Sequence, residues 1–282
     1  MKKLILLLGF MMLTAPVSFG ADCEYTCVEP YDMSSKVSSF FSNIFGMNFA
    51  KTQISESVLK KAILKNVQGD KNLKVDINSY SGKDLSKGIF KSLTMSGQNI
   101  NIDGIYLTSL ELKSLCDFNY VQYDKKGNLT FKEDFPMSFA LQMSADDINN
   151  TMKSEKYGKV VNDLNKLSFA GIKVSSTSAS IRGNRFYYAI YVTLPFVREP
   201  KKIEISADLN VQDGKIDFEN TKLSSNSFNF DLKKVDFLMN YLNPLDFSIN
   251  IFDNKDAKVY IKNIAIKNNI IETDGLVVIP KD

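Results

Sequence analysis

Residues 136–149 read PMSFALQMSADDIN, and a change of period inside this stretch decides the kind of fold. Up to Met143, large apolar side chains alternate with small or polar ones, which is the pattern of a half-buried β-strand. From Ser144 the period becomes helical, because serine is a favoured N-cap and the acidic pair Asp146 and Asp147 suits the first turn of a helix. The stretch therefore predicts a strand that leads directly into a helix.

The same two periods recur along the rest of the chain. Helical spacing appears at 34–49, 54–67, 144–164 and 232–242, whereas period-two alternation starts near residue 73. Strands follow strands, and the turn signals Asp213-Gly214 and Asn268-Asn269 join them as antiparallel hairpins. The pattern predicts an α+β fold with about ten strands and three or four helices. Expected strands include residues 73–77, 105–112, 115–123, 137–143, 181–194, 203–211 and 247–251.

The first twenty residues are typical of a secretory signal peptide. Lys2 and Lys3 precede an apolar run at 4–13, and Ser18 and Gly20 supply small side chains at a cleavage site. The run is too short to cross about 30 Å of hydrocarbon comfortably, although an uncleaved membrane anchor remains the alternative. We therefore expect an exported, periplasmic or envelope-associated protein.

The remaining chain shows no internal boundary of composition. We divide it into a segment at 21–50, which contains a Phe-rich amphipathic helix, and a single domain at 51–282. The formal net charge is +3, and lysines cluster only in pairs such as Lys60 and Lys61. This excludes the basic stripe that nucleic-acid binding needs.

The chain has three cysteines, an odd number for a compartment in which thiols oxidise. Cys23 and Cys27 are close enough in sequence to close a small loop, and whether they do so is left open. Asp22 argues against acylation of Cys23, because lipoprotein processing needs a small residue at that place. Cys116 lies among apolar residues, so we expect it to be buried as a small hydrophobe.

Catalytic chemistry finds little support in the residues. The chain has no histidine, which removes the Ser-His-Asp and Cys-His sites and the commonest general base. Ser57 and Lys60 match a Ser-x-x-Lys spacing without its companion motifs. The carboxylate pair Asp146 and Asp147 has adjacent side chains that point in different directions. We expect neither catalysis, nor a metal, nor a cofactor.

The order of segments resembles the LmeA-like family of envelope phospholipid-binding proteins. The likeness covers most of residues 52–280 and is one of fold pattern without a catalytic signature. It implies a lipid-binding module in which a strongly curved antiparallel sheet of about ten strands wraps two or three helices and leaves an apolar groove or tunnel. The resemblance rests on segments 54–67, 73–75, 96–100, 105–112, 136–140, 144–149, 268–271 and 274–278.

The family has no invariant ligand motif to transfer, so candidates for lining such a groove come from periodicity. The alternative is that the same side chains fill a solid core. The lining candidates are Leu59, Ile63, Phe139, Leu141, Ile148, Met152, Phe186, Tyr188 and Ile190.

The Phe-rich helix is a candidate for peripheral membrane contact, since interfacial helices carry large aromatic residues and few charges. Its candidate contact residues are Phe40, Phe41, Ile44 and Phe45. The alternative is a helix packed on the sheet. The expected function is non-catalytic binding of a phospholipid or another acyl-chain ligand, as a carrier or sensor. The rival is a solid-core scaffold that recruits a protein partner by strand addition.

Overall fold

The computed structural model describes residues 25–28, 60–61, 72–123, 129–166, 173–225, 242–249 and 257–282. The expected signal peptide at 1–20 and the Phe-rich helix at 34–49 lie outside the described residues. So do most of the helices expected at 54–67 and 232–242.

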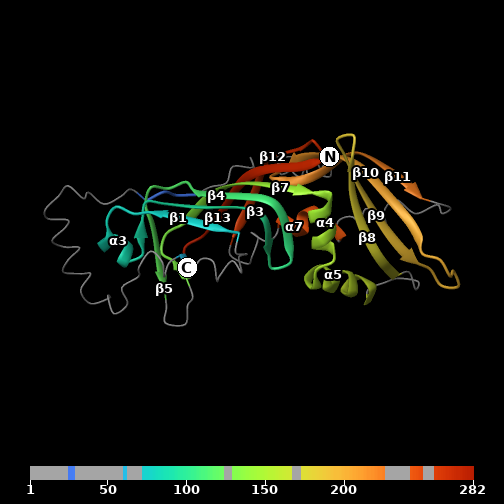
Figure 1. Cartoon of the computed structure of the whole chain (residues 1–282), viewed down its shortest axis with the longest axis horizontal. Helices are drawn as coiled ribbons and strands as arrows, with labels where there is room; N and C mark the ends of the chain where they lie inside the picture. Colours follow the sequence, from blue (N-terminus) through green and yellow to red (C-terminus); the bar gives the residue numbers. More distant parts are fainter. Residues whose placement is uncertain are drawn as a thin grey trace, which may run out of the picture.

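The fold is mostly β, with three antiparallel sheets and a few short helices in an elongated molecule (Figure 1). The six-stranded sheet contains, in order, β1 (Lys74–Asn78), β3 (Ser92–Ile102), β4 (Ile105–Ser114), β7 (Phe135–Ser144), β13 (Ile270–Ile279) and β12 (Lys258–Lys267). The four-stranded sheet contains β11 (Lys215–Ser225), β10 (Lys201–Gln212), β9 (Arg185–Thr193) and β8 (Lys173–Arg182). The three-stranded sheet contains β2 (Ile89–Phe90), β5 (Asn119–Tyr123) and β6 (Leu129–Phe131).

The antiparallel pairing is confirmed, but the single, strongly curved sheet of about ten strands is wrong. No sheet is strongly curled or closed in the described ranges. Two helices, α4 (Ala145–Met152) and α5 (Glu155–Lys166), lie in the chain between β7 and β8. The strand before them, β7, belongs to the six-stranded sheet, and the strand after them, β8, belongs to the four-stranded sheet. The expected 144–164 helix is therefore broken at Lys153 and Ser154.

The region around Pro244 also differs from expectation. A strand was expected at 247–251, after a helix that ends at residue 242, just before Asn243 and Pro244. The structure instead begins a helix there, α7 (Pro244–Ile249). Proline is well suited to the first helical position, and the Asn243 Oδ1 accepts a hydrogen bond from the Leu245 N–H at 3.0 Å. This local capping prevails over the alternation of Phe247 and Ile249.

Helix α4 lies between the two larger sheets, as Figure 1 shows, and packs against β4, β7 and β8. Its predicted N-cap is confirmed as a capping box. The Ser144 Oγ accepts a hydrogen bond from the Asp147 N–H at 3.2 Å, and the Asp147 Oδ2 accepts one from the Ser144 N–H at 2.9 Å. The Thr108 Oγ1 on β4 also donates to that carboxylate, at 2.5 Å. The cap thus fixes the helix against its own sheet.

Two asparagine side chains occupy the outer edge of β8. The Asn149 carboxamide on α4 donates to the Ala179 C=O at 2.8 Å and accepts from the Ala179 N–H at 2.9 Å. The Asn165 carboxamide on α5 pairs with the Val174 backbone in the same way, at 2.9 and 2.7 Å. Each carboxamide therefore takes the place of a neighbouring strand and satisfies edge groups that would otherwise be open to another chain.

The two larger sheets also meet at β12. There the Ile261 N–H donates to the Gly214 C=O at 2.8 Å, where the register of β12 against β13 shifts between Ile261 and Asn263. Gly214 sits in the β10–β11 turn with a φ of 73°, and an added Cβ would lie 3.2 Å from the Tyr260 ring. The predicted Asp213-Gly214 turn is confirmed and forms part of the joint between the sheets.

A disulfide joins Cys27 to Cys116, 89 residues apart. Cys27 therefore does not close the small loop with Cys23 that the sequence allows. Cys116 is buried as expected, with 2% of its surface exposed, but as half of a disulfide. Closing a loop of this length stabilises the fold by about 4.5 kcal/mol in the chain-entropy account. The bond is consistent with an extracytoplasmic protein. Within the described residues, no helix is long and apolar enough to cross a membrane.

Two glycines give a matched test of this packing. At Gly275 on β13, an added Cβ would lie 2.1 Å from the Tyr260 carbonyl oxygen and 2.8 Å from the Phe139 ring. At Gly158 in α5 it would meet nothing within 4 Å. We expect Gly275→Ala to lower the free energy of unfolding by about 1 to 3 kcal/mol through overpacking. Gly158→Ala should raise it by up to about 1 kcal/mol through helix propensity.

Urea denaturation of both variants beside the wild type measures the two changes. Equal effects of the two substitutions, or no loss at Gly275, would contradict the close approach of β12, β13 and β7.

Candidate functional site

The lining candidates that the structure describes all lie in one buried hydrophobic cluster. They come from three elements: β7, α4 and β9. Leu59 and Ile63 lie outside the described residues, as do the membrane-contact candidates Phe40, Phe41, Ile44 and Phe45. The described candidates are Phe139, Leu141, Ile148, Met152, Phe186, Tyr188 and Ile190, and none exposes more than 8% of its surface.

Phe139 and Leu141 point from β7 to the face of the six-stranded sheet that we call the inner face. This face carries the buried apolar residues of β1, β3, β4, β7, β13 and β12. One row of paired residues crosses all six strands on it. The row consists of Val75, Met95, Leu112, Phe139, Gly275 and Ile261. It contains no charged or polar side chain, and Gly275 leaves room for the Phe139 ring beside it.

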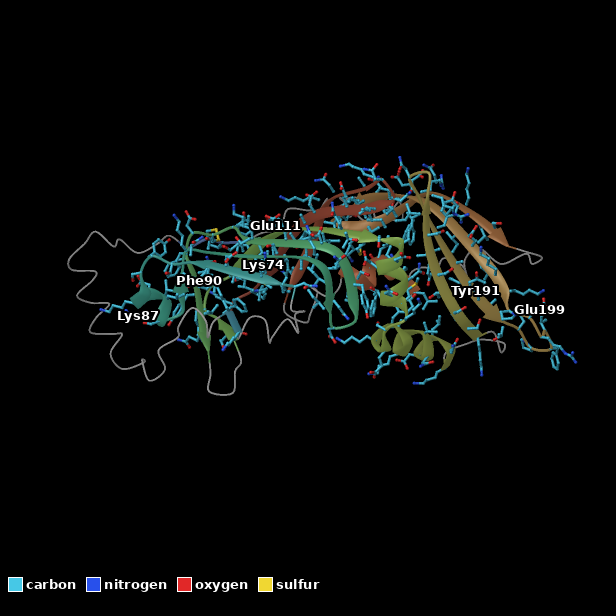
Figure 2. All side chains as sticks on the ribbon, viewed as in Figure 1. Lys74, Lys87, Phe90, Glu111, Tyr191 and Glu199 are labelled. Atoms are coloured by element: carbon cyan, nitrogen blue, oxygen red, sulfur yellow. A yellow bond between two sulfur atoms is a disulfide. The ribbon has the colours of Figure 1, made fainter. Side chains whose placement is uncertain are left out.

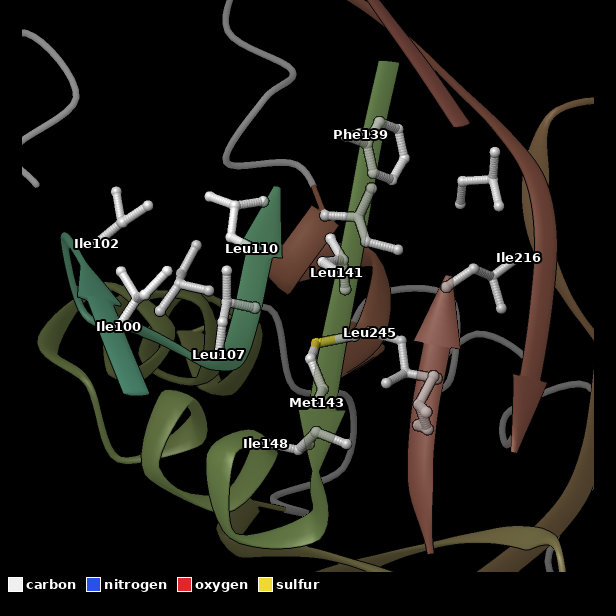
Figure 3. Packing of buried hydrophobic residues seen from close by; sticks show 14 of the residues in the cluster. Ile100, Ile102, Leu107, Leu110, Phe139, Leu141, Met143, Ile148, Ile216 and Leu245 are labelled. Atoms are coloured by element: carbon white, nitrogen blue, oxygen red, sulfur yellow. The ribbon is translucent and has the colours of Figure 1, made fainter. Parts of the chain in front are cut away.

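Ile148 and Met152 extend from α4 into the layer between the two larger sheets. Figure 3 shows Ile148 beside Met143 of β7, with Leu141 and Leu245 of α7 completing the packing. The Met152 sulfur accepts a hydrogen bond from the Thr177 Oγ1 of β8 at 3.2 Å. The two α4 candidates therefore connect the six-stranded sheet to the four-stranded one.

The β9 candidates are Phe186, Tyr188 and Ile190. They point toward the helices α4, α5 and α7 between the two larger sheets, which we call the helical layer. The Phe186 ring stacks on Phe218 of β11, with centroids 6.1 Å apart and planes 24° apart. Tyr188 and Ile190 are fully buried. The structure thus places the three β9 candidates on one side of the helices and the two β7 candidates on the other. It does not bring all seven around one common space.

A buried hydroxyl cluster lies between α5, β9 and Leu242. The Tyr157 and Tyr188 hydroxyls are 2.8 Å apart, and the Leu242 carbonyl oxygen lies 2.7 Å from the first and 3.1 Å from the second. One hydroxyl donates to this carbonyl, while the other donates either to it or to the neighbouring hydroxyl. Burial raises the pKa of both phenols, and that of Tyr188 lies well above its ordinary value. Both hydroxyls therefore remain neutral donors, as buried tyrosines in a satisfied network should.

Tyr157 did not appear among the sequence candidates, although a signal for it exists. It lies one helical turn before Val160 and Val161 and two before Leu164, on the apolar side of α5. Its ring also meets Phe247 of α7 edge to face, with centroids 5.3 Å apart. Helical spacing places it in the core, whereas its hydrogen-bond partners, far away in sequence, carry no local signal.

The opposite, outer face of the six-stranded sheet carries a polar groove of about 960 Å³. Its floor crosses β1, β3, β4, β7 and β13. Within it the Ser109 Oγ donates to the Gln142 Oε1 at 2.9 Å, and the Gln142 Nε2 donates to Glu272 at 3.1 Å. Lys267 also binds the Glu272 carboxylate, at 3.0 Å, and mainly through this hydrogen bond lowers its pKa. These groups satisfy one another and were not among the sequence candidates.

Within the described part of the chain, no group of three or more His, Cys, Asp or Glu side chains gathers as metal ligands would. Comparison of the chain with protein-family models, with curated proteins and with solved structures gives no match. The resemblance to the LmeA-like family therefore stays a prediction.

Asp246 on α7 gives a pH test of this region. Burial raises the pKa of its carboxyl, although the Asn243 Nδ2 donates to it at 2.8 Å. Because the folded-state pKa lies above the unfolded one, stability from this group is present at low pH. It is lost as pH rises from about 4 through the folded pKa. Asp246→Asn keeps the shape and removes the charge.

We expect the melting temperature of Asp246→Asn, relative to wild type, to increase between pH 4 and pH 7. Differential scanning calorimetry at several pH values measures the difference. A difference that stays constant with pH would show that folding does not change the pKa of this carboxyl.

Proposed function

We propose that this protein is an exported, non-catalytic binding protein of the cell envelope, which holds an acyl chain of a phospholipid or a similar apolar ligand as a carrier or sensor. The ligand would lie along the inner face of the six-stranded sheet. The observation that carries the proposal is the uncharged row across that sheet, from Val75 through Phe139 to Ile261. An acyl chain needs apolar contact shielded from water, at about 0.8 kcal/mol for each buried methylene.

The length of the inner face suits an acyl chain. Along β7, Phe135 and Met143 are eight residues apart, which corresponds to about 27 Å of strand. The acyl layer of one membrane leaflet is about 15 Å thick, half of the hydrocarbon core. A chain of that length therefore fits within the span of a single strand on this face.

Described elements contact the two ends of that span. At one end, Phe131 stacks on Phe135 with centroids 5.3 Å apart, and Phe90 meets Phe135 edge to face at 6.0 Å. At the other end, α4 packs near Met143 (Figure 3). Phe139 lies between these contacts, and it is the position that we assign to the acyl chain. The helical layer beyond α4 supports the site but would not line it.

A second candidate function is a solid-core domain that binds a protein partner. The observation in its favour is the close packing of the β9 and α4 candidates, whose side chains already contact one another or other core residues. Phe139 belongs to the same buried cluster and is only 2% exposed, so a ligand on the inner face would have to displace the atoms that now cover this ring. The two proposals therefore differ in what they expect at Phe139 of the inner face.

The first experiment is native mass spectrometry of the protein purified after export, at gentle and then at high collision energy. We expect an added mass equal to one phospholipid, which is released on activation and identified by fragmentation. A bare protein mass, unchanged after incubation with a phospholipid suspension, would favour the solid-core domain.

The second experiment places a reporter on the inner face. The chain has no tryptophan, so Phe139→Trp introduces a single fluorophore. We expect a brominated lysophospholipid, kept below its micelle concentration, to quench this fluorescence. Phe218→Trp on the four-stranded sheet is the matched aromatic control and should not be quenched. Circular dichroism checks that both variants fold.

Quenching at neither position, in variants that are folded, would exclude the inner face as an acyl-chain site. Equal quenching at both positions would place the ligand in the helical layer instead.

A further inference from the structure

The loop between β9 and β10 exposes one phenylalanine completely. Residues 194–200 read LPFVREP, and the Phe196 side chain has a relative exposure of 107%. The other large hydrophobic residues that are exposed in the described chain are near 40%: Tyr25, Val28 and Leu115. Figure 2 labels Glu199 at one extremity of the elongated molecule, so this loop forms the tip of the four-stranded sheet.

The backbone at Phe196 is one that phenylalanine rarely adopts. The Val197 N–H donates to the Leu194 C=O at 3.2 Å, which closes a four-residue turn with Pro195 and Phe196 at its centre. Phe196 has a φ of 66°, and a positive φ after proline is the requirement of a type II turn, which normally takes glycine there. The turn therefore holds a large apolar side chain away from the fold at a conformational cost.

Three cations lie in this loop or at the strand ends next to it. Arg198 is exposed in the loop, and Lys201 begins β10 opposite Val192. On the other side, Lys173 begins β8 opposite Thr193. Among the described residues these three cations form no ion pair, whereas Lys202 is paired with Glu204 at 2.6 Å. Glu199 is the acidic residue of the loop, so the three cations and Glu199 together carry a net positive charge.

We propose that this loop docks the protein on an anionic lipid surface, with Phe196 inserted at the boundary between headgroups and acyl chains. An exposed apolar side chain with cations at the adjoining strand ends complements that boundary, because the headgroup layer attracts the charges and the hydrocarbon accepts the ring. A protein partner would need a shaped apolar patch, whereas here a single ring projects beyond Pro195 and Val197. The position at the end of the molecule lets the tip reach a flat surface.

This docking goes beyond the proposed acyl-chain binding and fails independently of it. The inner face can hold a lipid whether or not the loop docks, and the loop can dock an empty protein. Phe40 and Phe41 are unchanged in every variant below. Any contact that they make with membranes is therefore the same in all variants, and differences between variants report on the loop.

A tryptophan at the tip gives the direct test, since the chain has none of its own. Exported Phe196→Trp protein is mixed with vesicles of phosphatidylglycerol and phosphatidylethanolamine that carry brominated acyl chains. We expect a blue shift and quenching of the tryptophan emission. Leu115→Trp, at a position 38% exposed beside Cys116, is the matched control and should show neither.

Two further variants separate docking from folding. Phe196→Gly suits the turn better, so its melting temperature should equal or exceed that of wild type, while vesicle co-sedimentation weakens about tenfold. Arg198→Gln with Lys201→Gln should weaken binding to vesicles containing phosphatidylglycerol and remove most of its salt dependence.

Three results would overturn the proposal. One is an unshifted, unquenched tryptophan at position 196, and another is wild-type vesicle binding by Phe196→Gly. The third is a blue shift at position 196 that requires a purified envelope protein and does not occur with vesicles, which would assign the loop to a protein partner.

Discussion

The pairing of β13 with β7 is the constraint on which the rest of the structure depends. Every residue from Ile270 to Ile279 pairs with one from Phe135 to Ser144 in unbroken register. This places the last strand of the chain inside the six-stranded sheet and positions β12 at its edge. The Ile261 N–H of β12 then reaches the Gly214 C=O of the β10–β11 turn. The joint between the larger sheets therefore depends on the C-terminal hairpin.

Local features of the sequence predicted local structure well. The N-cap at Ser144 and the turns at Asp213-Gly214 and Asn268-Asn269 are confirmed, because each depends on residues a few positions apart. One local prediction was wrong, because Pro244 begins a helix where a strand was expected at 247–251. The other errors are different in kind. Whether ten or more strands form one sheet or three depends on which strands meet across long sequence distances, and alternation carries no information about that. The same holds for the partner of Cys116, 89 residues away.

The candidate site was predictable only in part, for the same physical reason. Periodicity selected buried residues correctly, since Leu141, Ile148 and Ile190 are all in the core. It could not tell that the inner face and β9 lie on opposite sides of a helical layer. Nor could it identify Phe196, whose exposure follows from the turn geometry around Pro195 and contradicts the usual fate of an apolar residue. Apolar alternation in the sequence indicates which side chains are buried. It does not indicate which of them a ligand can reach.

The disulfide between Cys27 and Cys116 has a consequence for how the chain matures. Residue 27 emerges long before residue 116, and during that interval its nearest thiol in the sequence is Cys23. Short rings close more readily than long ones, so oxidation at that stage favours the wrong pair. A chain that takes this route reaches the native bond only by thiol–disulfide exchange. The third cysteine thus makes the yield of correctly bonded protein depend on the disulfide-isomerising capacity of the compartment.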